Sequence, residues 1–286
     1  MTVDPYQTVA VVTGSSSGIG FETSLTLARN GFYTYATVRK LEEGSNQITE
    51  IAKKENLPLQ AVQLDVSNEK SVIERINRIS EEKQRIDVVV NNAGYDLMGP
   101  LEETSMHEIK EQFETNFFGA VRVMQAVIPV MREQRSGKIV NITSVGGRIA
   151  VPFHSGYHGT KFALEGLSES LQYELGPFGI KVILIEPGAV GSSFWKNMKM
   201  AAKTSNLDNS NSPYRQMANY MSDAQKQMAQ NSLHPSEVAN VILRAVTSDN
   251  DDFRYTVGKD AAMSLEARRN MSDEEFTDLI KKQLHL

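Results

Sequence analysis

The chain contains no cysteine among its 286 residues. Disulfide bonds and thiolate metal sites are therefore excluded, and a reducing compartment is the natural environment. No long basic run is present, and the formal net charge is -5, which argues against nucleic acid as a partner. No apolar run approaches the ~18 residues that a membrane-spanning helix needs. The apolar stretch "TVAVVTG" begins a few residues from the N-terminus, which leaves no room for a signal peptide. We therefore expect a cytoplasmic protein with no membrane span.

Short apolar runs rich in β-branched residues alternate with longer stretches of helical period. The composition, 40% hydrophobic and 23% charged, is that of an ordinary globular protein. Strands buried on both faces and alternating with helices predict one doubly wound parallel sheet of about seven strands, Rossmann-like, with helices on both faces. We expect residues 1–286 to form a single domain. The expected strands are 8–13, 32–38, 59–64, 86–90, 138–143, 181–186 and 254–257.

One segment interrupts this alternation. Residues 191–233 contain many Met, Asn and Ser residues and no expected strand. Long insertions of this kind are usually lids or disordered loops, so we expect this one to cover the substrate. Its apolar, adaptable side chains suit a hydrophobic carbonyl or alcohol, although an amphipathic helix packed on the core explains them equally well. Those side chains are Phe194, Trp195, Met198 and Met200.

The stretch "GYHGTKFALEG" places Tyr157 four residues before Lys161, and "RYTVGKD" gives Tyr255 and Lys259 the same spacing. The first pair begins a helical stretch, where residues i and i+4 share a face about 6 Å apart. The second pair lies on or just beyond an expected strand, where four residues span about 13 Å. Only Tyr157 and Lys161 are therefore expected to act together, and Tyr255 is expected to be a structural ring.

The stretch "VAVVTGSSSGIGFE" places Gly14, Gly18 and Gly20 between the first strand and the first helix. A dinucleotide pyrophosphate binds backbone N–H groups at a helix N-terminus and needs an approach free of side chains. Glycine allows both the tight turn and the close contact. The alternative is an ordinary βα turn rich in glycine and serine, but its place as the first such turn favours a cofactor site.

The pattern TGxxxGIG resembles the short-chain dehydrogenase/reductase family, and further motifs of that family follow in order. They are "LDV" at 64–66, "NNAG" at 91–94, Asn116 in "FETNFFG", Ser144 in "NITS", the Tyr157 and Lys161 pair, and "EPGAV" at 186–190. The stretches "ATVRK" and "GRIAVPFHSGYHGTK" resemble most the hydroxysteroid- and retinol-dehydrogenase-like branch. By this resemblance, the cofactor-binding residues are Gly14, Ser15, Ser17, Gly18, Ile19, Gly20, Arg39, Asp65, Val66, Asn92, Ala93, Gly94, Tyr157, Lys161, Pro187, Gly188 and Val190.

The resemblance implies a catalytic tetrad of Asn116, Ser144, Tyr157 and Lys161. Hydride transfer at a carbonyl or alcohol carbon requires a proton to move at the oxygen. A free phenol, with a pKa near ~10, is poorly matched to that task at neutral pH. We expect the Lys161 ammonium and the oxidised nicotinamide to lower the pKa of Tyr157. In the family, the lysine also binds the nicotinamide ribose, the asparagine holds a water, and the serine positions the substrate oxygen. Taken alone, Ser144 would be a strand-end serine that caps backbone groups.

His154 and His158 flank Tyr157 and invite comparison with a hydrolase triad. No G-x-S-x-G elbow accompanies them, which argues against a serine hydrolase. We expect the two imidazoles to be partly exposed or to line the pocket. No cluster of carboxylates and histidines has the spacing of a metal site, so no metal is expected.

The end of the second strand predicts which cofactor is bound. NAD enzymes of this architecture usually carry an acidic residue there for the ribose 2′-hydroxyl. This chain has Val38 followed by Arg39 and Lys40. Arg39 and Ser17 resemble the family's 2′-phosphate site, and a guanidinium pairs well with phosphate. NADP(H) is therefore expected rather than NAD, the alternative being a solvated basic pair.

The sequence thus predicts an NADP(H)-dependent oxidoreductase acting on a carbonyl or secondary alcohol of a hydrophobic small molecule, with Tyr157 as acid and base. Steroids, retinoids, fatty carbonyls and xenobiotic ketones all remain compatible. By resemblance, a homodimer or homotetramer is expected. The alternative is an NAD(P)-binding regulatory or structural protein with little turnover, although such proteins often lose the tyrosine or the lysine. An epimerase or dehydratase would need a longer C-terminal part.

Overall fold

The computed structural model describes residues 8–191, 198–204, 212–230, 232–248, 250 and 252–283. Its central sheet has seven strands, all paired in parallel, in the order β3-β2-β1-β4-β6-β7-β9. These strands are β1 (Val9–Val12), β2 (Tyr33–Val38), β3 (Leu59–Gln63), β4 (Val88–Asn91), β6 (Gly137–Ile142), β7 (Ile180–Pro187) and β9 (Arg254–Val257). All seven predicted strands are confirmed, with ends shifted by at most two residues, and the predicted doubly wound parallel sheet is the observed fold.

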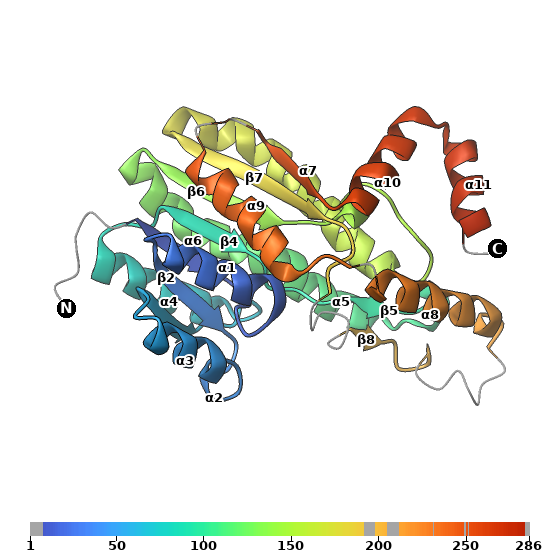
Figure 1. Ribbon diagram of the computed structural model, residues 1–286, viewed down its shortest axis with the longest axis horizontal. Coiled ribbons are helices and arrows are strands. Elements are labelled where there is room, and N and C mark those ends of the chain that lie inside the picture. The colour runs from blue at the N-terminus through green and yellow to red at the C-terminus, as the bar shows by residue number, and fades with distance from the viewer. Residues whose placement is uncertain are drawn as a thin grey trace.

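Helices cover both faces of this sheet (Figure 1). They are α1 (Gly18–Arg29), α2 (Leu41–Gly44), α3 (Asn46–Lys54), α4 (Glu69–Lys83), α5 (Met106–Phe113), α6 (Gly119–Gln134), α7 (Ser155–Leu175), α8 (Arg215–Gln230), α9 (Pro235–Thr247), α10 (Lys259–Asn270) and α11 (Asp273–Gln283). Short 3₁₀ turns lie at η1 (Leu101–Glu103), η3 (Val145–Gly147) and η4 (Gly176–Phe178), and a π-helical turn lies at η2 (Glu114–Phe118).

The alternation of side chains along each strand divides the core in two. Val9 and Val11 of β1 face a cluster that α4, α6 and α7 complete. Ala10 and Val12 face the opposite cluster, which α1 and α9 complete. Because successive side chains of a strand point to opposite faces, a strand with helices on both sides must be apolar throughout. This explains why the strands were visible in the sequence as continuous apolar runs.

Two features were not visible in the sequence. The stretch 109–134 has a helical period throughout, but it is divided into α5 and α6 by the π-helical turn η2. The segment 191–233, in which no strand was expected, contains β8 (Lys199–Met200), which pairs in parallel with β5 (Leu97–Met98). A two-residue strand has no period that a sequence could display, since its register depends on the partner strand. Phe194 and Trp195 lie outside the described residues.

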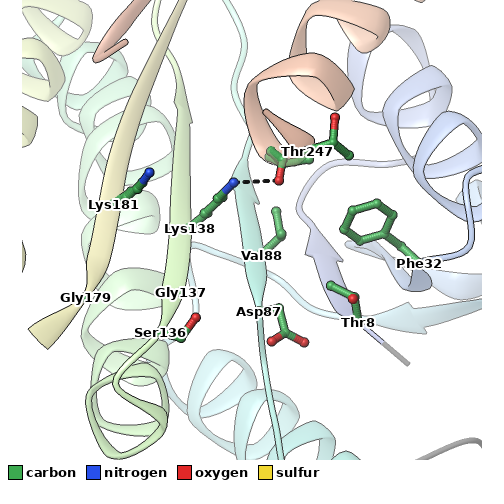
Figure 2. Close-up of a pocket in the computed structure, with 11 residues that line it drawn as sticks. Thr8, Phe32, Asp87, Val88, Ser136, Gly137, Lys138, Gly179, Lys181 and Thr247 are labelled. Carbon is green, nitrogen blue, oxygen red and sulfur yellow. Dashed lines mark hydrogen bonds between the residues drawn. The ribbon is translucent and has the colours of Figure 1, made fainter. Parts of the chain in front are cut away.

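A pocket of about 390 Å³ lies at the amino ends of β4, β6 and β7. Figure 2 shows Lys138 and Lys181 on neighbouring strands of this pocket. The Lys138 ammonium donates to the Val246 carbonyl at 2.7 Å and thereby binds the C-terminal end of α9. Since ligands of open parallel sheets bind at the carboxyl ends of the strands, this pocket lies at the opposite edge from the expected site. Among the described residues, none of the helices combines the length and the apolar character that crossing a membrane requires.

Candidate active site

The predicted site residues come from loops at one edge of the sheet. β1, β4, β6 and β7 are parallel neighbours, and each ends within or just before a predicted motif. The glycine turn follows β1, the "NNAG" stretch overlaps the end of β4, Ser144 follows β6, and Pro187 ends β7. The order of strands reverses between β1 and β4, and cofactors of doubly wound sheets bind at such a switch point.

The glycine turn has the backbone geometry that the sequence predicted. Gly14 has φ of +71° and Gly18 has φ of +60°, conformations that an L-residue adopts only with strain. A Cβ atom on Gly14 would stand 2.8 Å from the Ala93 Cα atom, and a Cβ atom on Gly20 would collide with Asn92. The N-cap residue of α1, Ser17, makes no side-chain capping hydrogen bond. That side chain therefore does not occupy the first backbone N–H groups of α1. An anion site requires such N–H groups to be left for the anion.

The "NNAG" stretch fixes the glycine turn from the side of β4. The backbone N–H groups of Asn92 and Ala93 both donate to the Thr13 hydroxyl, at 3.0 and 3.1 Å. The Asn92 side-chain amide donates to the Thr13 carbonyl at 2.9 Å. Thr13 and Asn92 thus hold two separate loops in one arrangement. Their role toward a cofactor stays a prediction.

Asn116 lies in the π-helical turn η2 and is buried. Its Oδ1 accepts from the Tyr95 N–H at 3.0 Å, and its Nδ2 donates to the Tyr95 carbonyl at 2.8 Å. The same Nδ2 lies 3.3 Å from the Thr160 hydroxyl of α7. π-helical turns are rare and frequent at functional sites. Asn116 therefore connects the loop after β4 to the helix that carries Tyr157.

Tyr157 and Lys161 lie on the first turns of α7, as their spacing predicted. The Lys161 ammonium is 5.6 Å from the centroid of the Tyr157 ring and donates to the Ile142 carbonyl at 2.8 Å. Ser144 is hydrogen-bonded to Tyr157 and also accepts from the Gly146 N–H at 3.0 Å. The two interpretations of Ser144 are thus compatible, since the serine caps a backbone group and also contacts the phenol.

Burial shifts both groups of this pair toward their neutral forms. Burial raises the pKa of Tyr157 above its ordinary value, the Ser144 hydrogen bond opposes this shift, and the negative charge of Asp96 adds to it. Burial lowers the pKa of Lys161 to about 8, against the opposing charges of Glu165 and Asp96. Within the chain itself, the effect of burial on the pKa of Tyr157 is larger than the lowering expected from Lys161, because desolvation disfavours phenolate and a spacing argument does not measure it. The part of the expectation that concerns the oxidised nicotinamide stays a prediction.

Replacement of Lys161 by methionine is expected to stabilise the protein at pH 7 by roughly 2–3 kcal/mol. Because the pKa is lowered on folding, from 10.5 to about 8, the unfolded chain holds a proton that the folded chain has released between these values. Stability therefore rises with pH in that window, and the advantage of Lys161→Met should shrink as the pH rises from about 8 to 10.5. Denaturant unfolding at pH 7 and pH 10 measures this. The control is Lys259→Met, at an exposed lysine of α10. Equal stability of wild type and Lys161→Met at both pH values would contradict the expectation.

Both histidines are buried, which excludes partial exposure, the first of the two predicted alternatives. His158 Nδ1 lies 2.8 Å from the Gly146 carbonyl, and His158 Nε2 accepts from the Val151 N–H at 3.0 Å. This fixes a neutral ring with its proton on Nδ1, and burial lowers the pKa of His158. His154 Nδ1 lies 2.8 Å from Asp96 Oδ2. Burial of this kind depends on tertiary packing, so the sequence could not reveal it.

The expected 2′-phosphate residues lie close to the glycine turn. The Ser15 N–H donates to the Thr37 carbonyl at 2.9 Å, which joins the turn to the end of β2. Arg39 and Lys40 follow β2 and are exposed. Lys40 forms a 2.8 Å ion pair with Glu43, whereas Arg39 has no hydrogen bond or ion pair among the described residues. Arg39 is thus the better placed of the two cations to receive a phosphate.

The remaining predicted residues also lie at this edge. Asp65 Oδ1 accepts from the backbone and hydroxyl of Ser67, and Val66 packs against Gly119. The Ser15 hydroxyl points inward and donates to the Val12 carbonyl at 3.0 Å, and Ile19 packs against the core. After β7, the Gly188 N–H donates to the Val257 carbonyl at 2.9 Å, and Val190 forms a bridge with Leu233.

Several acidic residues near the site were given no role of their own in the sequence analysis. Asp260 accepts from the Ala189 N–H at 2.7 Å and holds the loop after β7. Glu165 and Glu186, both buried, surround Arg254, and Arg148 pairs with Glu186 at 3.0 Å. A weak signal was available, because Glu186 ends the apolar run "KVILIE" and Glu165 follows Lys161 by one helical turn. Asp96, two residues beyond Gly94, gave no such signal.

Tyr255 lies on β9 and Lys259 begins α10, so the second tyrosine–lysine pair is not on one helix face. The Tyr255 ring packs against the core cluster on the α1 and α9 face. This confirms the predicted distinction between the two pairs.

Comparisons with known proteins agree with this geometry. Residues 8–203 match the family model described as short chain dehydrogenase. The chain is 35% identical over 250 residues to a 3-ketodihydrosphingosine reductase of Bacteroides thetaiotaomicron, and this match covers 87% of each chain. It is 36% identical over 256 residues to the human 17-beta-hydroxysteroid dehydrogenase type 1, which covers 87% of this chain and 77% of that protein.

Solved structures are similar over nearly the whole chain. A short-chain dehydrogenase from Streptomyces avermitilis superimposes with a TM-score of 0.82 at 30% identity, over 98% of both chains. An alcohol dehydrogenase from Thermococcus sibiricus, complexed with 5-hydroxy-NADP, superimposes with a TM-score of 0.71 at 26% identity, over 87% of this chain and 95% of that one. A short chain dehydrogenase/reductase from Burkholderia phymatum in complex with NAD gives 0.80 at 23% identity, over 95% of both, and supports the fold alone.

Proposed function

Because this chain belongs to the short-chain dehydrogenase family and is a dehydrogenase or reductase, we propose that it transfers a hydride between NADP(H) and a carbonyl or secondary alcohol. The substrate is a hydrophobic small molecule, and Tyr157 is the acid and base. The observation that supports this most is the meeting of Tyr157, Ser144, Lys161 and Asn116 beside the glycine turn, at the carboxyl edge of the sheet.

The residues present suit a dinucleotide. The glycine turn offers a helix N-terminus without a side-chain cap, and a Cβ atom on Gly20 or Gly188 would collide with its surroundings. When bound, the nicotinamide supplies or takes up the hydride. Arg39 and Ser17 would hold the 2′-phosphate, and no acidic residue stands at the end of β2 to bind a ribose hydroxyl there. These features favour NADP(H) over NAD(H).

Tyr157 moves the proton in this proposal. In reduction, the carbonyl carbon gains a hydride and the carbonyl oxygen gains the phenol proton, which gives the alcohol. With its raised pKa, Tyr157 holds its proton at neutral pH, so the phenol is in the form that can act as the acid in reduction. The Ser144 hydroxyl positions the oxygen, and the Lys161 ammonium lies close enough to stabilise the tyrosinate that remains.

An apolar cluster beside this edge supports a hydrophobic substrate. Its buried members are Met98, Phe153, Ala218 and Met221, and partly buried neighbours include Met198, Met217 and Ile280. We call this set the methionine cluster. Methionine adapts to irregular apolar shapes, as a substrate-binding wall must. We propose that residues 191–233 cover the substrate, with α8 packed along this wall. The names of both relatives above specify a keto or hydroxy compound, which agrees with the reaction class.

A panel of aliphatic, aromatic and steroidal ketones tests the function, with NADPH oxidation followed by absorbance. Reduction of at least one hydrophobic ketone, with NADPH preferred over NADH, is the expected result. Complete inactivity across the panel, together with measured NADPH binding, would instead support an NAD(P)-binding regulatory or structural protein.

Self-association is a further expectation. Phe118 of η2 and Phe162 of α7 are each 46% exposed. Large exposed aromatic side chains on neighbouring elements favour an interface between copies of the chain. Wild-type protein should sediment as a dimer or tetramer at micromolar concentration, and the Phe118→Glu/Phe162→Glu double variant should sediment as a smaller species. The control is Met263→Glu, at a residue of α10 that is 70% exposed. A wild-type monomer would refute the expectation.

A further inference from the structure

Asp96 is a buried carboxylate that the proposed mechanism does not use. It is 4% exposed and lies two residues beyond Gly94, between the end of β4 and the start of β5. Its carbonyl accepts from the Lys199 N–H at 2.9 Å, so β8 holds this segment in place. The backbone of Asp96 is therefore fixed by the pairing of β5 with β8, and its side chain is removed from water.

Within the part of the chain that the structure describes, one oxygen of this carboxylate has a hydrogen-bond partner and the other has none. Oδ2 lies 2.8 Å from His154 Nδ1, and the His154 side chain is 9% exposed. Oδ1 is buried and has no hydrogen-bond partner among the described residues. A buried carboxylate whose acceptor capacity is half used is costly, and nearly all buried polar atoms of folded proteins have partners. A hydrogen-bond donor supplied by a bound ligand would satisfy this oxygen.

The surroundings of the pair locate that ligand. Asp96 pairs with His154, the N-cap residue of α7, which carries Tyr157 three residues later, and its charge acts on both Tyr157 and Lys161. The carboxylate therefore lies near the proposed acid and base. After Asp96, the chain continues directly into Leu97 and Met98, and Met98 belongs to the methionine cluster. Asp96 thus lies at the junction of the reacting centre and the apolar wall.

His154 lies at the same junction. The preceding residue, Phe153, packs in the methionine cluster and has φ of +69°, a left-handed conformation that costs a bulky residue free energy. Its carbonyl accepts from the Gly99 N–H at 2.8 Å, which ties this turn to the segment after β5. This strained turn places the His154 side chain against Asp96, and it places the Phe153 side chain in the methionine cluster.

We propose that Asp96 Oδ1 binds the substrate, by accepting a hydrogen bond from a hydroxyl or amino group that the substrate carries near its reacting carbonyl. The rest of the substrate is apolar and packs against the methionine cluster. His154 holds the carboxylate in position through Oδ2. This inference rests on the proposed carbonyl chemistry and specifies the substrate class, a hydroxy- or amino-substituted ketone with an apolar body.

The test compares three ketones of equal chain length: a long-chain methyl ketone, the corresponding 1-hydroxy-2-ketone, and the corresponding 1-amino-2-ketone. Wild-type enzyme should prefer one or both donor-bearing ketones in kcat/KM. In Asp96→Asn, the amide oxygen can still accept from His154, which leaves an NH₂ group where Oδ1 was. Since a hydrogen bond to a charged group is strong, the preference over the methyl ketone should fall at least about tenfold. The preference is measured as the ratio of kcat/KM for a donor-bearing ketone to kcat/KM for the methyl ketone. This ratio cancels any effect of the variant that is common to all three ketones.

Glu111→Gln is the matched control, because it removes one negative charge from a half-exposed carboxylate of α5 near Tyr95. It should leave the ratio unchanged. The comparison of the hydroxy- and amino-ketones shows which donor is bound. No preference in wild type, or an equal loss for all three ketones in Asp96→Asn, would overturn the inference.

The proposed function and this inference can fail separately. Reduction of the methyl ketone by wild type supports the function, whatever the ratio shows. If no ketone is reduced, calorimetric titration of the hydroxy- and methyl ketones into enzyme saturated with NADPH still decides the inference. Tighter binding of the hydroxy-ketone that is lost in Asp96→Asn supports the subsite, and equal binding refutes it. Thermal unfolding of Asp96→Asn verifies that the variant is folded, and if it is not, the absence of any preference in the wild-type enzyme still overturns the inference.

Discussion

Tyr157→Phe should lower kcat/KM for ketone reduction by about a thousandfold, since general acid catalysis contributes about 10²- to 10⁴-fold. The variant keeps the ring, which lies 5.9 Å from the His158 ring in an edge-on arrangement, and removes only the phenol oxygen. NADPH affinity and thermal stability should therefore change little. Stopped-flow or steady-state measurement of NADPH oxidation gives the rate, and fluorescence titration gives the affinity. Retention of more than about a tenth of wild-type activity would remove Tyr157 from the proposed role.

Tyr255→Phe is the matched control for this variant. Tyr255 has the same spacing to a lysine, but it lies on β9 and packs against the core. Removal of its hydroxyl should leave kcat/KM nearly unchanged. A loss comparable to that of Tyr157→Phe would overturn the distinction between the two pairs, which the positions of the pairs on different elements otherwise support.

The sequence was sufficient for the parts of this site that depend on strand ends. Parallel strands buried on both faces appear as apolar runs, and their carboxyl ends must meet at one edge. For this reason the sequence predicts that Gly14, Ser144 and Pro187 lie together, although each is more than forty residues from the next along the chain. The spacing of Tyr157 and Lys161 is similarly a local property of one helix.

The parts that were missed depend on contacts between distant segments. The partner of His154 is Asp96, which is supplied by a loop 58 residues earlier in the sequence. The π-helical turn at Asn116 and the strand β8 likewise depend on what packs beside them, and neither has a period of its own. The direction of the Tyr157 pKa shift followed from burial. Burial of a polar side chain is a property of the assembled fold, and no pattern in one segment reports it.

In the proposed function, the cofactor preference depends on one exposed side chain, that of Arg39. The end of β2 is joined to the glycine turn by the hydrogen bond from Ser15 to Thr37, and Arg39 follows two residues later. Lys40 forms an ion pair with Glu43, so the two neighbouring cations, Arg39 and Lys40, are not equivalent. A 2′-phosphate bound near the turn would meet the guanidinium of Arg39, which suits a phosphate better than an ammonium does. Arg39 therefore decides between NADPH and NADH if the proposal is correct.

Arg39→Asp should lower the preference for NADPH over NADH at least about a hundredfold, and it can invert the preference. A charge-assisted hydrogen bond contributes about 1.5–3 kcal/mol, and repulsion between the new carboxylate and the phosphate adds to its loss. Each ~1.4 kcal/mol corresponds to a factor of ten in affinity. The measurement is the ratio of kcat/KM for the two cofactors, at one low salt concentration because exposed charges are screened. Lys40→Asp, with the same change of charge one residue away, should have the smaller effect, since Lys40 already pairs with Glu43. A ratio for Arg39→Asp within about threefold of wild type would make Arg39 an ordinary solvated cation, and the assignment of NADP(H) would then lose its main support.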